Sequence, residues 1–290
     1  MIGTALCQRF EKNSIPHLQL SRNPSGSSKK LVYWNPEEKV LEHEKLREVD
    51  TVIHLAGENV GKRWTHNTRK KILSSRSDSS RFLFEKLAAQ DSPPKTLIAS
   101  SAIGIYGYKN STQFDEESPR GNGFLADVVE AWEESTQPLK DVGCRVILMR
   151  QGLVLSPKGG ALARMLPFFR FGLGGTLGSG QQMMSWIGME DQIRAILFFL
   201  EDDTQSGVYN LVSPKPVCNI EFTAILGWVL KRPTLFPVPA LALRAVFGEM
   251  AKQTMLASQH VIPKKLLQAG FEFKYPELEQ ALEYCLKHEN

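Results

Sequence analysis

Small and polar residues follow a buried strand near residue 50, and they are the first candidates for a ligand site. Residues 49–55 form a short apolar, β-branched run, which is typical of a strand buried on both faces of a parallel sheet. Ala56 and Gly57 then allow close approach to the backbone, and polar Glu58 follows. In an open α/β sheet, ligands bind outside the carboxyl ends of the strands. The pattern predicts a ligand crevice from Leu55 onward, although an ordinary strand-to-loop junction looks the same.

A basic segment comes next and has no acidic residue between Asn59 and Ser77; its cations are Lys62, Arg63, Arg69, Lys70, Lys71 and Arg76. Only one aromatic residue, Trp64, interrupts it, so the segment does not predict a nucleic-acid site. Apolar residues at a helical period predict a helix over residues 66–90 with one buried face. We expect most of these cations to lie on a solvated helix face, and we single out Arg76 as the exception.

The remaining elements must position these residues. Buried strands are predicted over residues 96–100, 145–150 and 207–212, and the first of them runs into Ser101 and Tyr106. Helices are predicted over residues 124–133, 161–171, 192–200, 219–230, 239–250, 263–269 and 276–287. A Gly- and Ser-rich stretch, residues 172–180, lacks both a preceding strand and a G-K-[ST] sequence, so it predicts a flexible loop and not a phosphate loop.

The first twenty residues predict a helix followed by a short strand over residues 15–20. A helix and a strand make the second half of a β-α-β unit, and a right-handed crossover needs a strand before that helix. The sequence does not supply this strand. We therefore expect a truncated gene product or isoform, with a chain that fills the place in some other way as the alternative.

Composition excludes several classes of protein. With 290 residues and 42% hydrophobic content the chain can bury a large core, and a net charge of +4 is too small to indicate nucleic acid. The four cysteines and six histidines are scattered, so we expect free thiols and no metal site. No apolar run approaches the ~18 residues of a membrane span. We expect no membrane partner and a cytoplasmic location, with an organelle left open because the N-terminus is in doubt.

Several motifs occur in the order of one known family. They are Ile2-Gly3-Thr4-Ala5-Leu6, Ser21-Arg22, Leu55-Ala56-Gly57-Glu58-Asn59, Ser100-Ser101-Ala102 with Tyr106-Gly107, Arg150-Gln151-Gly152-Leu153-Val154-Leu155, Gly159-Gly160 and Gly172-Leu173-Gly174-Gly175. The pattern resembles the epimerase-like branch of the extended short-chain dehydrogenase/reductases, including bacterial cell-division-inhibitor homologues. The resemblance runs from residue 2 to about residue 286 and includes that branch's C-terminal module.

The resemblance implies a doubly wound parallel-sheet NAD(P)-binding Rossmann fold over residues 1–213, with a substrate-side excursion at about 155–190. Residues 214–290 would form a small, mainly helical C-terminal domain. Gly3 matches the last glycine of the family's G-x-x-G-x-x-G loop, so the first strand and two earlier glycines are absent. Arginine after the second strand suits the 2′-phosphate of NADP(H) better than the ribose hydroxyl of NAD. The cofactor residues implied are Gly3, Ser21, Arg22, Leu55, Ala56, Gly57, Glu58, Lys71, Arg76, Ser100, Gly152, Leu153 and Val154.

The family's catalytic pair is missing from this sequence. Ser101 occupies the position that hydrogen-bonds the reacting oxygen, but Leu125 and Val129 stand where the resemblance places tyrosine and lysine. Tyr106 or Asp127 could substitute, although neither has an evident cationic partner in the sequence. We take Ser101 and Tyr106 as the catalytic candidates, and expect Tyr106 to keep a pKa near its usual ~10.

Two functions stay open. The first is an NADP(H)-binding epimerase-like oxidoreductase of unknown small-molecule substrate with a degenerate Tyr/Lys pair. The second is a non-catalytic nucleotide-binding or regulatory protein, or an inactive isoform. A homodimer is left open in either case.

Overall fold

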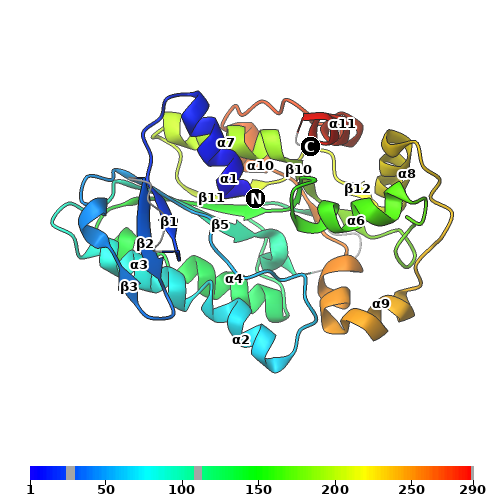
Figure 1. Cartoon of the computed structure of the whole chain (residues 1–290), viewed down its shortest axis with the longest axis horizontal. Helices are drawn as coiled ribbons and strands as arrows, with labels where there is room; N and C mark the ends of the chain where they lie inside the picture. The colour runs from blue at the N-terminus through cyan, green and yellow to red at the C-terminus, as the bar shows by residue number, and fades with distance from the viewer. Residues whose placement is uncertain (24–29, 108–112, 289–290) are drawn as a thin grey trace.

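The computed structural model describes residues 1–23, 30–107 and 113–288. Parallel strands form a layer with helices on both faces, and a mainly helical region lies at one end (Figure 1). The predicted α/β fold with a parallel sheet is therefore confirmed.

The central sheet has four parallel strands in the order β11-β7-β5-β4. They are β4 (Thr51–His54), β5 (Thr96–Ala102), β7 (Arg145–Gln151) and β11 (Gly207–Leu211). Their apolar composition follows from burial on both faces. The register places Ser101 of β5 directly opposite Arg150 of β7, which is the pairing that matters most for the site.

A separate small sheet precedes β4. It consists of β1 (Gln19–Ser21), parallel to β2 (Leu31–Asn35), and of β3 (Val40–Leu41), antiparallel to β2. The prediction of a strand over residues 15–20 was wrong about its start, because Pro16 cannot donate to a strand ladder and pairing begins only at Gln19. Within the described residues β1 and β4 are not paired with each other. That the chain lacks the family's first strand stays a prediction.

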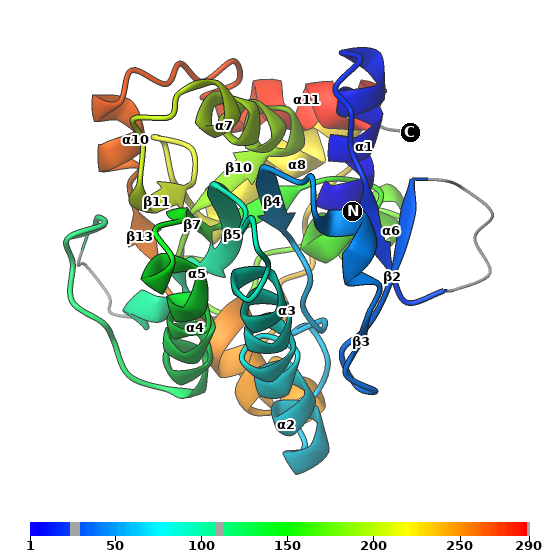
Figure 2. The ribbon, with the colours of Figure 1, turned by 90° about the vertical axis from the view of Figure 1, so that its left-hand side faces the viewer.

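Helices cover the two faces of the central sheet, as Figures 1 and 2 show. On one face lie α1 (Ile2–Lys12) and α7 (Met189–Glu201), which share a core cluster with the sheet residues Ile98 and Ile147. On the other lie α3 (Asp78–Ala88), α4 (Phe124–Glu134) and α5 (Gln137–Asp141). The 3₁₀ turns η1 (His43–Leu46) and η2 (Ile103–Tyr106) lead into β4 and out of β5.

The helix predicted over residues 66–90 is two helices, α2 (His66–Ser74) and α3, so that prediction was wrong about continuity. The hydroxyl of Ser75 donates to Ile72 O, and that of Ser77 donates to Leu73 O. Serine side chains that bond backbone carbonyls in this way compete with the helical ladder. The break lies at Arg76 and turns its side chain toward the end of β4.

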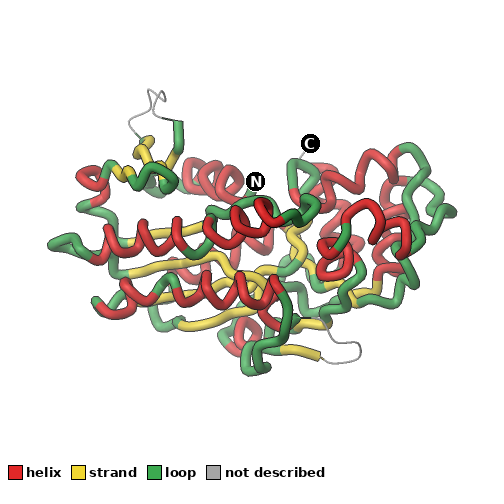
Figure 3. The backbone as a smooth tube through the Cα atoms, turned by 90° about the horizontal axis from the view of Figure 1, so that it is seen from below, coloured by secondary structure: helices red, strands yellow, loops and turns green. Residues whose placement is uncertain are grey.

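Most of the remaining helices form the mainly helical end, on the right of Figure 3. They are α6 (Gly160–Arg170), α8 (Asn219–Leu230), α9 (Ala240–Phe247), the π-helical turn η3 (Ala251–Met255) and α11 (Leu278–His288), whereas α10 (Lys264–Gln268) packs against β11 of the central sheet. The short strand pairs are β8 (Leu153–Leu155) with β10 (Trp186–Gly188), β9 (Met183–Met184) with β12 (Val217–Cys218), and β6 (Gln113–Phe114) with β13 (His260–Val261).

Helix α9 is shorter than the predicted 239–250, because Gly248 has a φ of 62° and ends it. One core cluster joins residues of α6, β8, α8 and α11. The predicted excursion and C-terminal segment therefore share packing, and the domain boundary at residue 213 stays a prediction.

Within residues 1–23, 30–107 and 113–288, no helix is both long and apolar enough to cross a bilayer. The same residues contain no cluster of three His, Cys, Asp or Glu side chains suited to a metal ion. The four cysteines, which all lie in the described residues, form no disulfide, and Cys144 and Cys285 are buried.

Candidate functional site

The N-terminus of α1 lies at the carboxyl end of β4. A Cβ atom added at Gly3 would lie 3.9 Å from Leu55 Cδ1, and one added at Gly159 would lie 3.2 Å from the Met1 sulfur. Two predicted cofactor residues, Gly3 and Leu55, are therefore neighbours in space. A helix N-terminus at the end of a parallel strand has the N–H groups and the dipole direction that favour an anion.

Gly57 and Arg76 meet at the same edge of the sheet. A Cβ atom added at Gly57 would lie 3.1 Å from Arg76 Cζ, so the guanidinium lies directly over the Gly57 backbone. Any larger residue at position 57 would force Arg76 to move. The break between α2 and α3 thus brings together two predicted residues that are nineteen positions apart in the sequence.

Arg76 has no carboxylate partner in the described part of the chain. Its Cζ lies 4.9 Å from the centroid of the Trp132 ring, and Nη1 donates long hydrogen bonds to Ile72 O (3.3 Å) and Ser75 Oγ (3.5 Å). Burial lowers the pKa of Arg76 to about 10, and the charge of Glu58 offsets part of this effect. A guanidinium held in a partly desolvated place without an anion is ready to bind one.

Glu58 belongs to the same corner. Its backbone N–H donates to Ser75 Oγ at 3.0 Å, and its carboxylate forms an ion pair with Lys62 at 2.8 Å. The hydrogen bond from Lys62 lowers the pKa of Glu58, and the charge of Lys71 contributes a smaller decrease. The structure therefore brings together Gly3 with Leu55 and Gly57 with Arg76, and Lys71 is exposed on α2.

The two catalytic candidates lie at the end of β5 and belong to one buried hydrogen-bond network. Ser101 Oγ donates to Glu133 Oε1 at 2.5 Å, and Glu133 accepts two hydrogen bonds from Arg150, both of 2.8 Å. Arg150 Nη1 donates to the Tyr106 hydroxyl at 3.0 Å, and that hydroxyl donates to Asn210 Oδ1 at 2.8 Å. Ser101 and Tyr106 are each only 1% exposed.

The electrostatics of this network favour a neutral Tyr106. Burial raises its pKa above the usual value, although Arg150 and Asn210 act in the opposite direction. Burial also disfavours the charge of Arg150, but the hydrogen bonds and charge of Glu133 outweigh this and raise the Arg150 pKa. The expected pKa near 10 for Tyr106 was therefore too low, because the sequence did not show how completely the phenol is buried.

The sequence showed no evident cationic partner for Tyr106 or Asp127, but the structure provides one for each. Arg150 lies 5.1 Å from the centroid of the Tyr106 ring and bonds its hydroxyl, and Arg120 forms an ion pair with Asp127. These partners are 44 and 7 residues away in the sequence, so proximity along the chain did not reveal the first of them. The roles of Ser101 and Tyr106 in catalysis stay predictions.

The other predicted cofactor residues lie in three places. Arg22 is exposed at the end of β1 and forms no ion pair among the described residues, and Ser21 Oγ accepts a hydrogen bond from Asn23 N at 3.1 Å. Ala56 and Ser100 pack within the sheet region. Gly152, Leu153 and Val154 form the passage from β7 to β8.

The glycine at 152 has a structural reason of its own. A Cβ atom there would lie 2.5 Å from Ser185 O and 2.6 Å from Val212 Cγ1, so only glycine fits. Packing therefore accounts for Gly152, and Leu153 and Val154 lie against hydrophobic core clusters.

Sequence reasoning did not assign the network partners Glu133, Arg150 and Asn210. A signal was present, because Arg150 directly follows the apolar run 146–149 within the same buried strand, and a charge in a buried strand requires a partner. His54, a polar side chain at the end of the buried strand β4, was also not assigned. It is 3% exposed, neither ring nitrogen has a hydrogen-bond partner among the described residues, and burial lowers its pKa to about 4.

The fold and this strand-end site define an enzyme-like Rossmann protein. The chain belongs to the NAD dependent epimerase/dehydratase family, whose model matches residues 1–211; a domain of unknown function, DUF1731, matches residues 238–285. An epimerase family protein of Mycobacterium bovis is 40% identical over 286 residues, which cover 98% of this chain and 94% of that protein. One from Staphylococcus aureus is 35% identical, over 99% of this chain and 96% of its own.

Solved structures agree with this family. Human epimerase family protein SDR39U1 (isoform 2), crystallised with NADPH, superposes with a TM-score of 0.89 and 31% identity, over 99% of this chain and 96% of that one. A nucleoside-diphosphate sugar epimerase from Corynebacterium glutamicum superposes with a TM-score of 0.80 and 30% sequence identity, over 100% of this chain and 56% of that one. UDP-glucose 4-epimerase of Thermotoga maritima, at 16% identity, shows likeness of fold alone.

Proposed function

We propose that this chain is an NADP(H)-binding, epimerase-like short-chain dehydrogenase/reductase whose substrate is a small molecule still to be identified. The observation that carries the proposal is Arg76, which lies over Gly57 at the carboxyl end of β4 without a carboxylate partner. The NADPH-bound human relative, similar over almost the whole chain, supports the same cofactor. When bound, the nicotinamide would supply the hydride chemistry, and the protein would bind and orient it.

The residues present fit this cofactor at two points. Arg76 and the helix α1 N-terminus offer positive potential where a pyrophosphate would approach the end of β4. Arg22 offers an exposed guanidinium after β1, where a 2′-phosphate is recognised in such folds. Lys71 adds a third positive charge near Glu58.

The Arg22→Asp variant tests the cofactor assignment. Loss of a charge-assisted hydrogen bond and gain of repulsion should weaken NADPH binding by about 2–3 kcal/mol and leave NADH binding nearly unchanged. Calorimetric titration of both cofactors into wild type and variant measures this difference. An equal loss for the two cofactors would rule out recognition of the 2′-phosphate by Arg22.

The second candidate, a nucleotide-binding protein without catalysis, is favoured by the closed network at the end of β5. The hydroxyls of Ser101 and Tyr106 already have protein partners, and Tyr106 is held neutral. Leu125 and Val129 pack close to Gly104, where a Cβ atom would lie 3.3 Å and 3.7 Å from them. This arrangement supports a degenerate catalytic pair.

Single-turnover NADPH oxidation against carbonyl compounds and sugar nucleotides separates the two candidates. With any substrate found, we expect Ser101→Ala to reduce the rate more than Tyr106→Phe. A loss of about a thousandfold from Tyr106→Phe alone, the size expected of an acid/base group, would contradict the degenerate site.

A further inference from the structure

The helical end of the molecule exposes large apolar side chains on three neighbouring segments. Phe171 and Leu173 follow α6, Trp228 lies near the end of α8, and Leu235 and Phe236 lie in the loop that leads to α9. Their exposed fractions run from 57% to 81%. Monomeric proteins rarely leave so many aromatic and aliphatic side chains together in water. We call these five residues the apolar surface.

Contacts show that these segments lie side by side. A Cβ atom at Gly172 would lie 3.6 Å from Pro233, Arg232 Nε donates to Arg170 O at 2.8 Å, and Leu177 pairs with Val238. A Cβ atom at Gly227 would lie 2.5 Å from Thr234. The apolar surface is therefore one region, at the right-hand end of Figure 1, where the segment after α6 lies beside the loop that follows α8.

The segments that carry the apolar surface hold charges of one sign. No acidic residue occurs from 142 to 189 or from 222 to 248. Arg170, Lys231 and Arg232 adjoin the apolar surface in the sequence and are exposed, and none of them forms an ion pair in the described part of the chain. An apolar region with exposed aromatic residues and a cationic rim is complementary to an anionic lipid surface.

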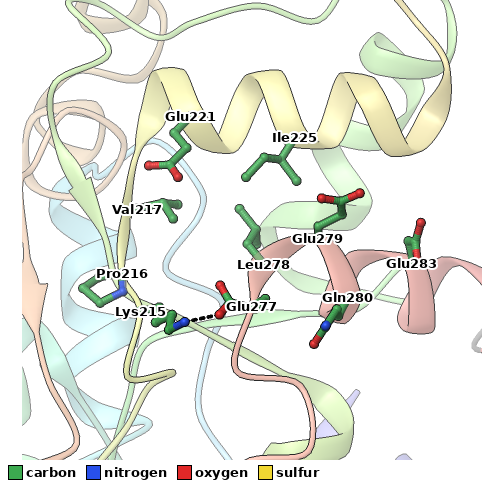
Figure 4. Close-up of a pocket in the computed structure, with 10 residues that line it drawn as sticks. All are labelled: Lys215, Pro216, Val217, Glu221, Ile225, Glu277, Leu278, Glu279, Gln280 and Glu283. Carbon is green, nitrogen blue, oxygen red and sulfur yellow. Dashed lines mark hydrogen bonds and ion pairs between the residues drawn. The ribbon is translucent and has the colours of Figure 1, made fainter.

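The other end of α8 carries the reverse charge. A cavity of about 510 Å³ between α8 and α11 is lined by Glu221, Glu277, Glu279 and Glu283, with Lys215 paired to Glu277 (Figure 4). Helix α8 is therefore acidic at its start and basic and aromatic at its end. Such polarity along α8 orients a protein on a negatively charged plane with the end of α8 directed toward the plane.

We propose that the apolar surface and its cationic rim bind the face of an anionic lipid bilayer. A two-fold contact with a second copy is disfavoured, because it would place cations against cations, and the segments that would meet contain no acid. The earlier prediction of no membrane partner was based on the lack of a spanning segment, and surface binding needs none. The proposal does not depend on cofactor binding.

Co-sedimentation with vesicles tests the proposal on the full chain. We expect binding to phosphatidylcholine vesicles that contain phosphatidylglycerol, and little binding to phosphatidylcholine alone. The double variant Arg170→Gln/Lys231→Gln should bind about 25-fold more weakly, at roughly fivefold for each lost charge. Phe171→Ser/Leu235→Ser should weaken binding by at least about tenfold.

Lys86→Ser/Lys140→Ser is the matched control, because it removes the same charge from exposed positions on the Rossmann region. An equal loss of binding in this control, or no binding of wild type to anionic vesicles, would overturn the proposal. The proposal would also be overturned if the protein did not bind vesicles but self-associated with concentration, and if Phe171→Ser/Leu235→Ser abolished that self-association. The apolar surface would then bind a second copy of the chain.

Discussion

The polar side chains at the ends of β5 and β4 differ in whether they have partners within the protein. At the end of β5, Ser101 and Tyr106 are joined to Glu133, Arg150 and Asn210 in a buried network in which each has a partner. At the end of β4, His54 has no hydrogen-bond partner among the described residues and Arg76 has no carboxylate. The first arrangement stabilises the fold, whereas the second leaves the Arg76 charge without an anionic partner, so a ligand can supply one.

The largest expected effect comes from opening the network at the end of β5. Glu133→Ala leaves the Arg150 guanidinium buried without its anion, which should lower the free energy of unfolding by about 3–5 kcal/mol. Urea denaturation measures the change. Glu134→Gln is the control, because its side chain is exposed on the same helix and should alter stability by less than about 0.5 kcal/mol. Equal effects of the two variants would show that the network is not structural.

The next effect concerns His54 at the end of β4. Its pKa in the folded protein, about 4, lies below the usual 6.5, so the unfolded chain takes up the proton first as the pH falls. The corresponding stability is fully present above about pH 6.5 and is lost as the pH falls toward 4. Between about pH 7 and about pH 4.5, wild type should lose about 2 kcal/mol more than His54→Phe.

Denaturation of both proteins at the two pH values tests this, with the exposed His66→Gln as the control. If wild type and His54→Phe lose stability in parallel, His54 is not held neutral by burial.

The general architecture could be predicted from the sequence, because apolar β-branched runs and helical periods are local features. The strands predicted over residues 96–100 and 145–150 are confirmed, and Leu55, Gly57 and Glu58 follow a strand as predicted. Three-dimensional partners could not be predicted. Ser101 meets Glu133 and Arg150 through the parallel register and the packing of α4, neither of which is encoded in local spacing.

The break at Arg76 shows the same limit on a smaller scale. The apolar period continues from α2 into α3, so the sequence predicted one helix. The hydrogen bonds from the Ser75 and Ser77 hydroxyls to backbone carbonyls accompany the break, and they depend on side-chain rotamers that composition does not determine.

The smallest expected effect on stability is that of Arg76→Met. Since this guanidinium is largely desolvated and has no carboxylate partner, removing its charge should change the free energy of unfolding by no more than about 1 kcal/mol, and in the stabilising direction. Methionine keeps the packing against Trp132. If Arg76→Met lowered the free energy of unfolding as much as Glu133→Ala does, the polar groups at both strand ends would stabilise the fold.

Titration of NADPH into wild type and Arg76→Met, followed by calorimetry, tests the central claim most directly. If the end of β4 is kept open for the cofactor, wild type binds NADPH and the variant binds at least about tenfold more weakly, because a charge-assisted contact is worth about 1.5–3 kcal/mol. The variant should keep its stability while it loses affinity. Equal affinities in the two proteins, or no binding of NADPH to wild type, would contradict the account.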